Sequence, residues 1–596
     1  MIKKLLALLS RSERNNIKVL MGMILLMSFL DVLGVASILP FTTVLLNPEL
    51  IQSNNILYSA FTFSHQIGIH TVEQFLFILG VMVFVVLFIS LAFKALTIYL
   101  QNRIILMLEY SIGKRFVEGY LHQPYSWFLS RNSADLGKNI LSEIQIVINS
   151  GMLPMITLIA QSTVTIALLI MLLVIDPLLA ISVILFLILA YGIIFTLVKN
   201  WLKRLGKERS QANKDRFNII SETFSAAKEV KVGGLEETCV QRFSKPAEIY
   251  ARGQTTARII GLMPRFALEA IVFGGMLLLI LFLMTQRGSF TSAIPIIALY
   301  AFTGYRLMPA LQQIYAAFTQ LRFVRSAVEN LYKDLSSLKI SRKRPSLISP
   351  LKFKECIHLK SVSYCYPKAI SPVLKAIDIK VYANNRVGIV GATGSGKTTT
   401  VDVILGLLKP KEGHLIVDSQ PITNENLYQW QQVIGYVPQN IYLVDDTVAA
   451  NIAFGKYSKD MDQDAIEFAA RNANIHEFII KELPQGYATK VGERGVRLSG
   501  GQRQRIGIAR ALFQKPQVLI LDEATSALDN LTEQLVMEKI NNLGYDITII
   551  MIAHRLSTLQ NCDQIYFMQQ GEVKASGTYD QLTKSNQKFA AMAKIV

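Results

Sequence analysis

Cysteine is scarce in this 596-residue chain, which excludes a fold built on disulfides. The four thiols, Cys239, Cys356, Cys365 and Cys562, match no paired metal-ligand spacing, so we expect them to be reduced and without a special role. Acidic residues are also in the minority: 43 Asp and Glu stand against 61 Lys and Arg, for a formal net charge of +18. Such a charge fits a nucleic-acid-binding protein or a membrane protein with basic inner loops.

The distribution of apolar residues favours the membrane and predicts no nucleic-acid partner. Six apolar stretches occupy the first 310 residues, each near the length that crosses a ~30 Å hydrocarbon core. They cover residues 19–42, 75–100, 152–175, 178–198, 262–285 and 290–310. The N-terminus carries no cleavage-site pattern, so we expect the first span to be retained.

The rest of the chain has the composition of a soluble domain. Residues 335–350 are basic and contain two prolines, as a linker would. Beyond them, strand-like runs at 387–390, 518–521 and 547–552 alternate with helical stretches, which indicates an α/β fold. We therefore predict a multidomain protein: an all-α, six-helix transmembrane domain (1–334), the linker, and an α/β P-loop nucleotide-binding domain (351–596).

Lysine and arginine predict the topology of the membrane domain. The loop 47–72 contains neither, whereas the N-terminus and the loops 101–150 and 199–261 are basic. By the positive-inside rule both termini and the two long loops are cytoplasmic. We expect the long loops to be helical, and residues 54–65 of the outer loop to form a short helix on the membrane surface, with a packed loop as the alternative.

A glycine-rich segment predicts nucleotide binding. Gly391, Gly396, Lys397 and Thr398 match the phosphate-loop pattern G-x-x-x-x-G-K-[ST] directly after an apolar strand. Glycine lets backbone N–H groups turn toward a phosphate, Lys397 would reach the β- and γ-phosphates, and the Thr398 hydroxyl would bind Mg²⁺. The predicted ATP cradle consists of Gly391, Ala392, Thr393, Gly394, Ser395, Gly396, Lys397, Thr398 and Thr399.

Two further patterns accompany this loop. An apolar strand at 518–521 ends in Asp522, placed to bind Mg²⁺, and Glu523, placed to activate an attacking water as general base. A second anion cradle is predicted at a helix start, where small residues expose backbone N–H groups. It comprises Ser499, Gly500, Gly501 and Gln502.

Together these motifs resemble the ATP-binding cassette transporters, specifically their exporter-type half-transporters. The resemblance implies that Tyr366 stacks on adenine, Gln439 is the lid residue that senses Mg²⁺, and Asp529 lies in the loop linking two nucleotide sites. It also implies that His554 holds the γ-phosphate as a third catalytic residue beside Lys397 and Glu523. In that family the cradle at Ser499 faces the phosphate loop of a second cassette, so a homodimer is expected, with a heterodimer as the alternative.

Charges inside the spans bear on the cargo. Asp31 lies midway through the first span, and Lys94, Arg265 and Arg306 lie toward the inner ends of theirs. An intramembrane charge is functional by default because it is costly to insert. Our hypothesis is a basic belt that holds an anionic lipid headgroup. The alternatives are that Lys94 and Arg265 snorkel to the interface, or that Arg265 pairs with Glu269 one turn away.

Short phrases at 263–269, 305–309 and 439–443 resemble bacterial flippases for lipid-linked oligosaccharides. This resemblance implies ATP-driven transfer of a polyprenyl-pyrophosphate glycan from the inner to the outer leaflet of a bacterial inner membrane, with membrane lipid as a partner. One alternative is an exporter of peptides, drugs or other lipids. Another is an ATP-gated regulator or channel that moves no cargo.

Overall fold

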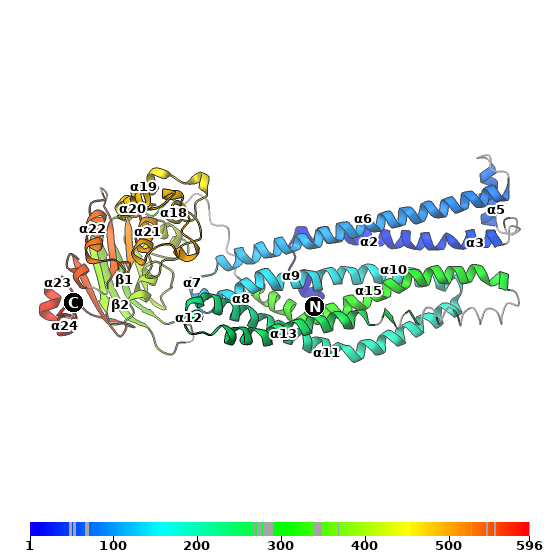
Figure 1. Ribbon diagram of the computed structural model, residues 1–596, viewed down its shortest axis with the longest axis horizontal. Helices are drawn as coiled ribbons and strands as arrows, with labels where there is room; N and C mark the ends of the chain where they lie inside the picture. The colour runs from blue at the N-terminus through cyan, green and yellow to red at the C-terminus, as the bar shows by residue number, and fades with distance from the viewer. Residues whose placement is uncertain are drawn as a thin grey trace. The chain divides into compact units, whose positions relative to one another are not determined.

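The chain separates into a helical unit and a sheet-containing unit in the computed structural model (Figure 1). The first unit comprises Met1–Gln123 and Arg131–Ser341, and the second comprises Pro124–Ser130 and Arg342–Val596. The structure describes residues 1–46, 51, 55–65, 71–263, 265–266, 269–270, 274, 277, 290–338, 349–367, 369–525, 527–543, 546–553 and 556–594.

Long helices dominate the first unit. Its α-helices are α1 (Ile2–Ala7), α2 (Arg11–Ala36), α3 (Ile38–Leu46), α5 (Asn55–His65), α6 (Val72–Leu121), α8 (Ser133–Lys138), α9 (Ile144–Val147), α10 (Leu153–Ile175), α11 (Pro177–Ser225), α12 (Ala227–Val232), α13 (Glu236–Leu262) and α15 (Phe290–Ser337). Two π-helical turns, η1 (Asn139–Glu143) and η2 (Ile148–Met152), flank α9.

Three stretches of described helix are long and apolar enough to cross a membrane: Arg11–Leu45, Val72–Leu121 and Ser133–Ile175. They contain the first three predicted spans. The predicted spans 178–198 and 290–310 fall within α11 and α15, while most of 262–285 lies outside the described residues.

The helices also extend beyond the bilayer. The 50 residues of α6 span about 75 Å at helical rise, more than twice the thickness of the hydrocarbon core. The basic loop 101–150 is therefore helical as predicted, and so is most of 199–261, which α11, α12 and α13 occupy.

The predicted helix in the outer loop is present as α5. The ring of Phe61 on α5 packs edge-to-face on Phe75 of α6, with centroids 5.2 Å apart. Val44 and Ile51 are buried in the same small apolar cluster. The helix is thus anchored to the start of α6 by side-chain packing.

Two sheets build the second unit. Its strands are β1 (Cys356–Tyr364), β2 (Leu374–Tyr382), β3 (Arg386–Gly391), β4 (Glu412–Val417), β5 (Gln420–Pro421), β6 (Ile434–Val437), β7 (Val518–Asp522), β8 (Thr548–Ile552), β9 (Gln564–Gln569) and β10 (Glu572–Gly577). One sheet has the order β2-β1-β4-β5, and the other has the order β10-β9-β3-β8-β7-β6. The three strands predicted from sequence correspond to β3, β7 and β8.

Helices accompany these sheets, and α7 (Tyr125–Phe128) is grouped with the same unit. The others are α16 (Lys397–Ile404), α17 (Leu427–Gln431), α18 (Val448–Ile452), α19 (Gln463–Asn472), α20 (His476–Glu482), α21 (Gly500–Leu512), α22 (Asn530–Asn541), α23 (Tyr579–Ser585) and α24 (Gln587–Lys594).

Strand order brings the sequence motifs together. Strands β3, β8 and β7 are parallel neighbours, and Ile552 of β8 is in register with Ile389 on one side and Asp522 on the other. The carboxyl ends of parallel strands meet at one edge of the sheet, where ligands bind in α/β folds. The phosphate loop that follows β3 and the carboxylates that end β7 therefore share this edge.

Candidate functional site

The loop between β3 and α16 has the backbone of a phosphate cradle. Gly394 and Gly396 adopt φ angles of +79° and +101°, which disfavour any residue with a side chain. At Gly391 an added Cβ would lie 2.2 Å from the carbonyl oxygen of Met568. These glycines let the chain turn tightly at the start of α16, as a phosphate cradle requires.

Lys397 folds back over this loop. Its Nζ donates hydrogen bonds to the carbonyl oxygens of Gly391 at 2.9 Å and Ala392 at 3.2 Å. Burial lowers the pKa of the ammonium group, and the negative charges of Glu523 and Asp522 oppose that shift. The lysine is thus held by weak neutral acceptors, which a phosphate oxygen would replace with a stronger partner.

Asp522 fits a divalent cation. The side chain is buried, and among the residues that the structure describes its Oδ1 atom has no hydrogen-bond partner. Burial and the neighbouring Glu523 raise the pKa of its carboxyl to about 6, against the attraction of Lys397. A buried, unpaired carboxylate oxygen is a hard ligand of the kind that Mg²⁺ prefers.

Glu523 and Gln439 meet beside this carboxylate. Gln439 Nε2 donates a hydrogen bond of 2.5 Å to Glu523 Oε2. Glu523 has a positive φ of +51°, a strained conformation of the kind that recurs at functional sites. The structure therefore joins the predicted general base to the predicted lid residue.

Tyr366 lies against the phosphate-loop helix. Its hydroxyl is 3.0 Å from the Thr399 Oγ1 atom, and its ring packs edge-to-face on Tyr364. Thr398, the predicted Mg²⁺ ligand, is exposed at the start of α16, whereas Ser395 is buried and its Oγ atom has no partner among the described residues. The predicted cradle thus retains free hydrogen-bonding capacity.

The second predicted cradle is the N-terminus of α21. Ser499 Oγ accepts a hydrogen bond from the Gln502 backbone N–H, and Gln502 Oε1 accepts one from the Ser499 N–H. This capping box leaves Gly500 and Gly501 in the first turn of a 13-residue helix. Asp529 is the N-cap of α22, where its carboxylate accepts a hydrogen bond from the Thr532 backbone N–H.

Two residues complete the comparison with the sequence. His554 lies outside the described residues. Asp402 on α16 was not predicted as a site residue. Burial and the charge of Asp522 raise the pKa of its carboxyl to about 6. A lone acid among the apolar residues of 401–405 was the signal that pointed to it.

The charged residues of the spans form a cluster around Asp31. This side chain is fully buried on α2, and Arg306 Nη1 of α15 lies 2.5 Å from its Oδ1. Lys94 Nζ of α6 lies 3.4 Å from Oδ2, and Ser90 Oγ donates to Oδ1 at 2.8 Å. Two of the three cations of the predicted belt therefore meet at one carboxylate.

The third cation has a separate partner. Arg265 Nε is 2.8 Å from Glu269 Oε1, one helical turn along the chain. This is the local pair that the sequence offered as an alternative. Both side chains keep contact with solvent or lipid, since Arg265 is 53% exposed.

The site and the fold define a membrane-bound nucleotide hydrolase, and comparisons with known proteins name its family. The family described as "ABC transporter transmembrane region" matches residues 13–307, and "ABC transporter" matches residues 374–526. The chain belongs to the ABC transporters and has the exporter architecture, and its ATP-binding domain couples ATP hydrolysis to transport.

Individual relatives agree with this assignment. An "ATP-dependent lipid A-core flippase" of Cupriavidus metallidurans is 31% identical over 80% of each chain. The protein of the same name from Chromobacterium violaceum is 34% identical over 66% of this chain and 67% of its own. A bacterial Atm1-family ABC exporter solved with ATP bound shares the fold, with a TM-score of 0.78 and 22% identity over 98% of each chain.

Proposed function

We propose that this transporter flips a lipid-linked oligosaccharide, with a pyrophosphate between glycan and polyprenyl chain, from the inner to the outer leaflet of a bacterial inner membrane. The observation that carries the proposal is the cluster of Asp31, Lys94 and Arg306. It holds two cations for one carboxylate and lies on three apolar helices. A net positive charge within a membrane is expensive and is kept where function needs it.

The cluster retains donors for an anionic headgroup. A guanidinium has five N–H donors and an ammonium has three, and Asp31 accepts one hydrogen bond from each of the two cations. Lys94 is also 29% exposed. A pyrophosphate would gain charge-assisted hydrogen bonds from Lys94 and Arg306 while the apolar chain stays in the bilayer.

The relatives support a glycolipid as the class of cargo. Two of them are named lipid A-core flippases, which assigns that activity to those proteins. Extending a related cargo to this chain is part of our proposal. Arg265 is included as a further headgroup contact, although its described partner is Glu269.

We further propose that two copies of the chain assemble, because the N-terminus of α21 then closes the phosphate loop of the other copy over ATP. Residues Thr398, Gln439 and Asp522 would hold Mg²⁺, which offsets phosphate charge when bound. Tyr366 would stack on adenine, and Glu523 would accept a proton from the attacking water. His554 is assigned the γ-phosphate on family grounds alone.

Reconstituted protein tests the cargo. ATP hydrolysis is measured in lipid with and without polyprenyl-pyrophosphate-linked oligosaccharide, and Glu523→Gln serves as the inactive control. We expect glycolipid to stimulate the wild type and not Arg306→Ala. Arg204→Ala, which removes an exposed cation paired with Glu208, should keep the stimulation. An equal response of both arginine variants would contradict a headgroup role for Arg306.

The competing proposal is an exporter of peptides, drugs or other lipids. The ion pairs of Arg306, Lys94 and Arg265 favour it, because each cation already has a carboxylate partner. Stimulation by peptides or drugs, together with no response to glycolipid, would support this exporter. Hydrolysis that responds to neither would support a regulator without cargo.

A further inference from the structure

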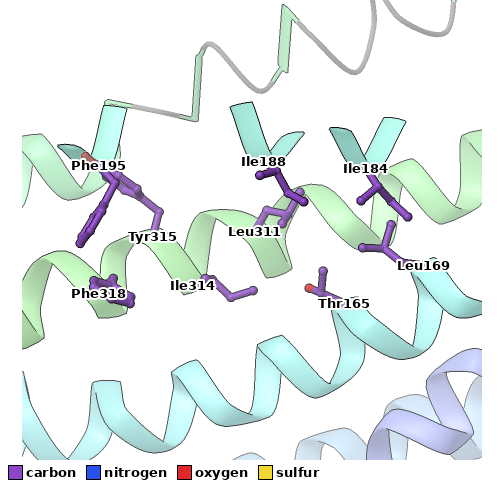
Figure 2. A pocket seen from close by; sticks show the side chains of 9 residues that line it. All are labelled: Thr165, Leu169, Ile184, Ile188, Phe195, Leu311, Ile314, Tyr315 and Phe318. Atoms are coloured by element: carbon purple, nitrogen blue, oxygen red, sulfur yellow. The ribbon is translucent and has the colours of Figure 1, made fainter. Parts of the chain in front are cut away.

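An apolar cavity lies between α10, α11 and α15 (Figure 2). Its volume is about 330 Å³, at the small end of the range for ligand pockets. Aliphatic side chains such as Leu169, Ile188 and Leu311 form its wall, and Phe195 and Phe318 stand together at one end (Figure 2). Such a wall suits a hydrocarbon chain and offers almost nothing to a polar ligand.

A cation marks the aromatic end of the cavity. The guanidinium carbon of Arg322 lies 5.6 Å from the ring centroid of Phe195 and 5.7 Å from that of Phe318. The residues one turn away on α15, Phe318, Thr319, Arg325 and Ser326, include no acid. Within the described residues Arg322 forms no ion pair with a carboxylate.

The sequence around Phe195 places this end at the inner face of the membrane. The predicted span 178–198 ends three residues later, and Lys199, Trp201 and Lys203 follow. Trp201 is 52% exposed, as expected for an aromatic residue at the headgroup level. The cavity therefore begins at the inner interface, where Arg322 lies. The α15 residues that line it, Leu311 to Phe318, place the inner end of the α15 span beyond the predicted residue 310.

We propose that this cavity binds one hydrocarbon chain of an anionic phospholipid of the inner leaflet, with the lipid phosphate at Arg322. The apolar wall accounts for the hydrocarbon chain, and Arg322, which pairs with no carboxylate of the described residues, accounts for the negative headgroup. The volume suits part of one lipid. The site is distinct from the Asp31 cluster and does not depend on the identity of the cargo.

One wall residue supplies a matched control. Thr165 is 7% exposed, and within the described part of the chain its hydroxyl has no hydrogen-bond partner. A hydrocarbon chain cannot form a hydrogen bond with this hydroxyl, so Thr165→Val should retain lipid binding or strengthen it. Leu311→Trp and Leu169→Phe, in contrast, enlarge wall residues into the space that the chain would occupy.

Photolabelling tests the proposal. The full-length protein is reconstituted with phosphatidylglycerol or phosphatidylcholine carrying a diazirine on one acyl chain, and labelled peptides are identified by mass spectrometry. We expect labels on the cavity segments of α10, α11 and α15. The anionic lipid should label roughly fivefold more than the zwitterionic one, since a basic residue near a membrane surface is worth about 1 kcal/mol.

The variants separate the two parts of the site. Arg322→Gln should reduce the lipid preference to about one, while Leu311→Trp should remove labelling by both lipids and Thr165→Val should keep it. If Leu311→Trp fails to fold, Leu169→Phe and the comparison of the two lipids on the wild type still test the proposal. Equal labelling of the wild type by both lipids would overturn the proposal. So would unchanged labelling in the filled cavity, or photocrosslinks from an amino-acid probe at position 311 to a second copy of the chain.

Discussion

Two buried carboxylates, one in each unit, differ in how fully other side chains satisfy them. Asp31 in the helical unit receives Arg306, Lys94 and Ser90 from two other helices. Asp522 in the sheet-containing unit has one oxygen without a partner in the described part of the chain, and its pKa is raised to about 6. A carboxylate satisfied by its own protein holds helices together, whereas an unsatisfied one is available to a ligand. The predictions below test this contrast.

The largest effect is expected at the predicted ATP site, beside Asp522. Glu523→Gln removes the proposed general base and should lower ATP hydrolysis about 10²–10⁴-fold, because proton transfer contributes that much to catalysis. Nucleotide binding should persist, since Gln439 and the phosphate loop are unchanged. Steady-state hydrolysis and binding of a fluorescent ATP analogue measure the two effects. Glu477→Gln, an exposed glutamate paired with Lys481, is the control that should hydrolyse ATP normally.

Changes at Asp31 should lower the stability of the helical unit. Asp31→Asn leaves Lys94 and Arg306 without their carboxylate inside the helical unit, and breaking a buried pair in this way destabilises by about 3–5 kcal/mol. Thermal unfolding in detergent measures the loss. Ser90→Ala removes one hydrogen bond to the same carboxylate and should lose about 1 kcal/mol. If the two variants unfold alike, Asp31 does not hold these helices together.

The stability of the sheet-containing unit should also depend on pH. Because the pKa of Asp522 is raised above its ordinary value of 3.8, the folded state binds this proton more tightly than the unfolded chain does. Stability without nucleotide or metal should therefore fall as pH rises from about 4 through about 6. Unfolding midpoints across this range should fall less in Asp522→Asn. An unchanged slope in that variant would assign the dependence to Asp402, whose pKa is also about 6.

The same contrast explains what the sequence could predict. The phosphate loop is a run of adjacent residues, and the carboxylates end a strand, so fixed spacing and parallel-strand geometry were sufficient to place Lys397 beside Asp522. The partners of Asp31 lie 59, 63 and 275 positions away. Their meeting depends on the rotation and axial register of three helices, and apolar periodicity does not specify these. Of the three cations of the predicted belt, Lys94 and Arg306 therefore pair with Asp31, whereas Arg265 pairs with Glu269.

Arg265 provides the smallest and most discriminating test. Its pair with Glu269 is local and more than half exposed on the arginine side, so Arg265→Gln should change the unfolding free energy by less than about 0.5 kcal/mol. Stability then gives no reason for Arg265 to matter, unlike Arg306. If the variant nonetheless loses stimulation of ATP hydrolysis by lipid-linked oligosaccharide, while Glu269→Gln retains it, Arg265 contacts the headgroup. If both variants respond as the wild type does, the pair is a surface feature of its helix, and the headgroup site is confined to the cluster at Asp31.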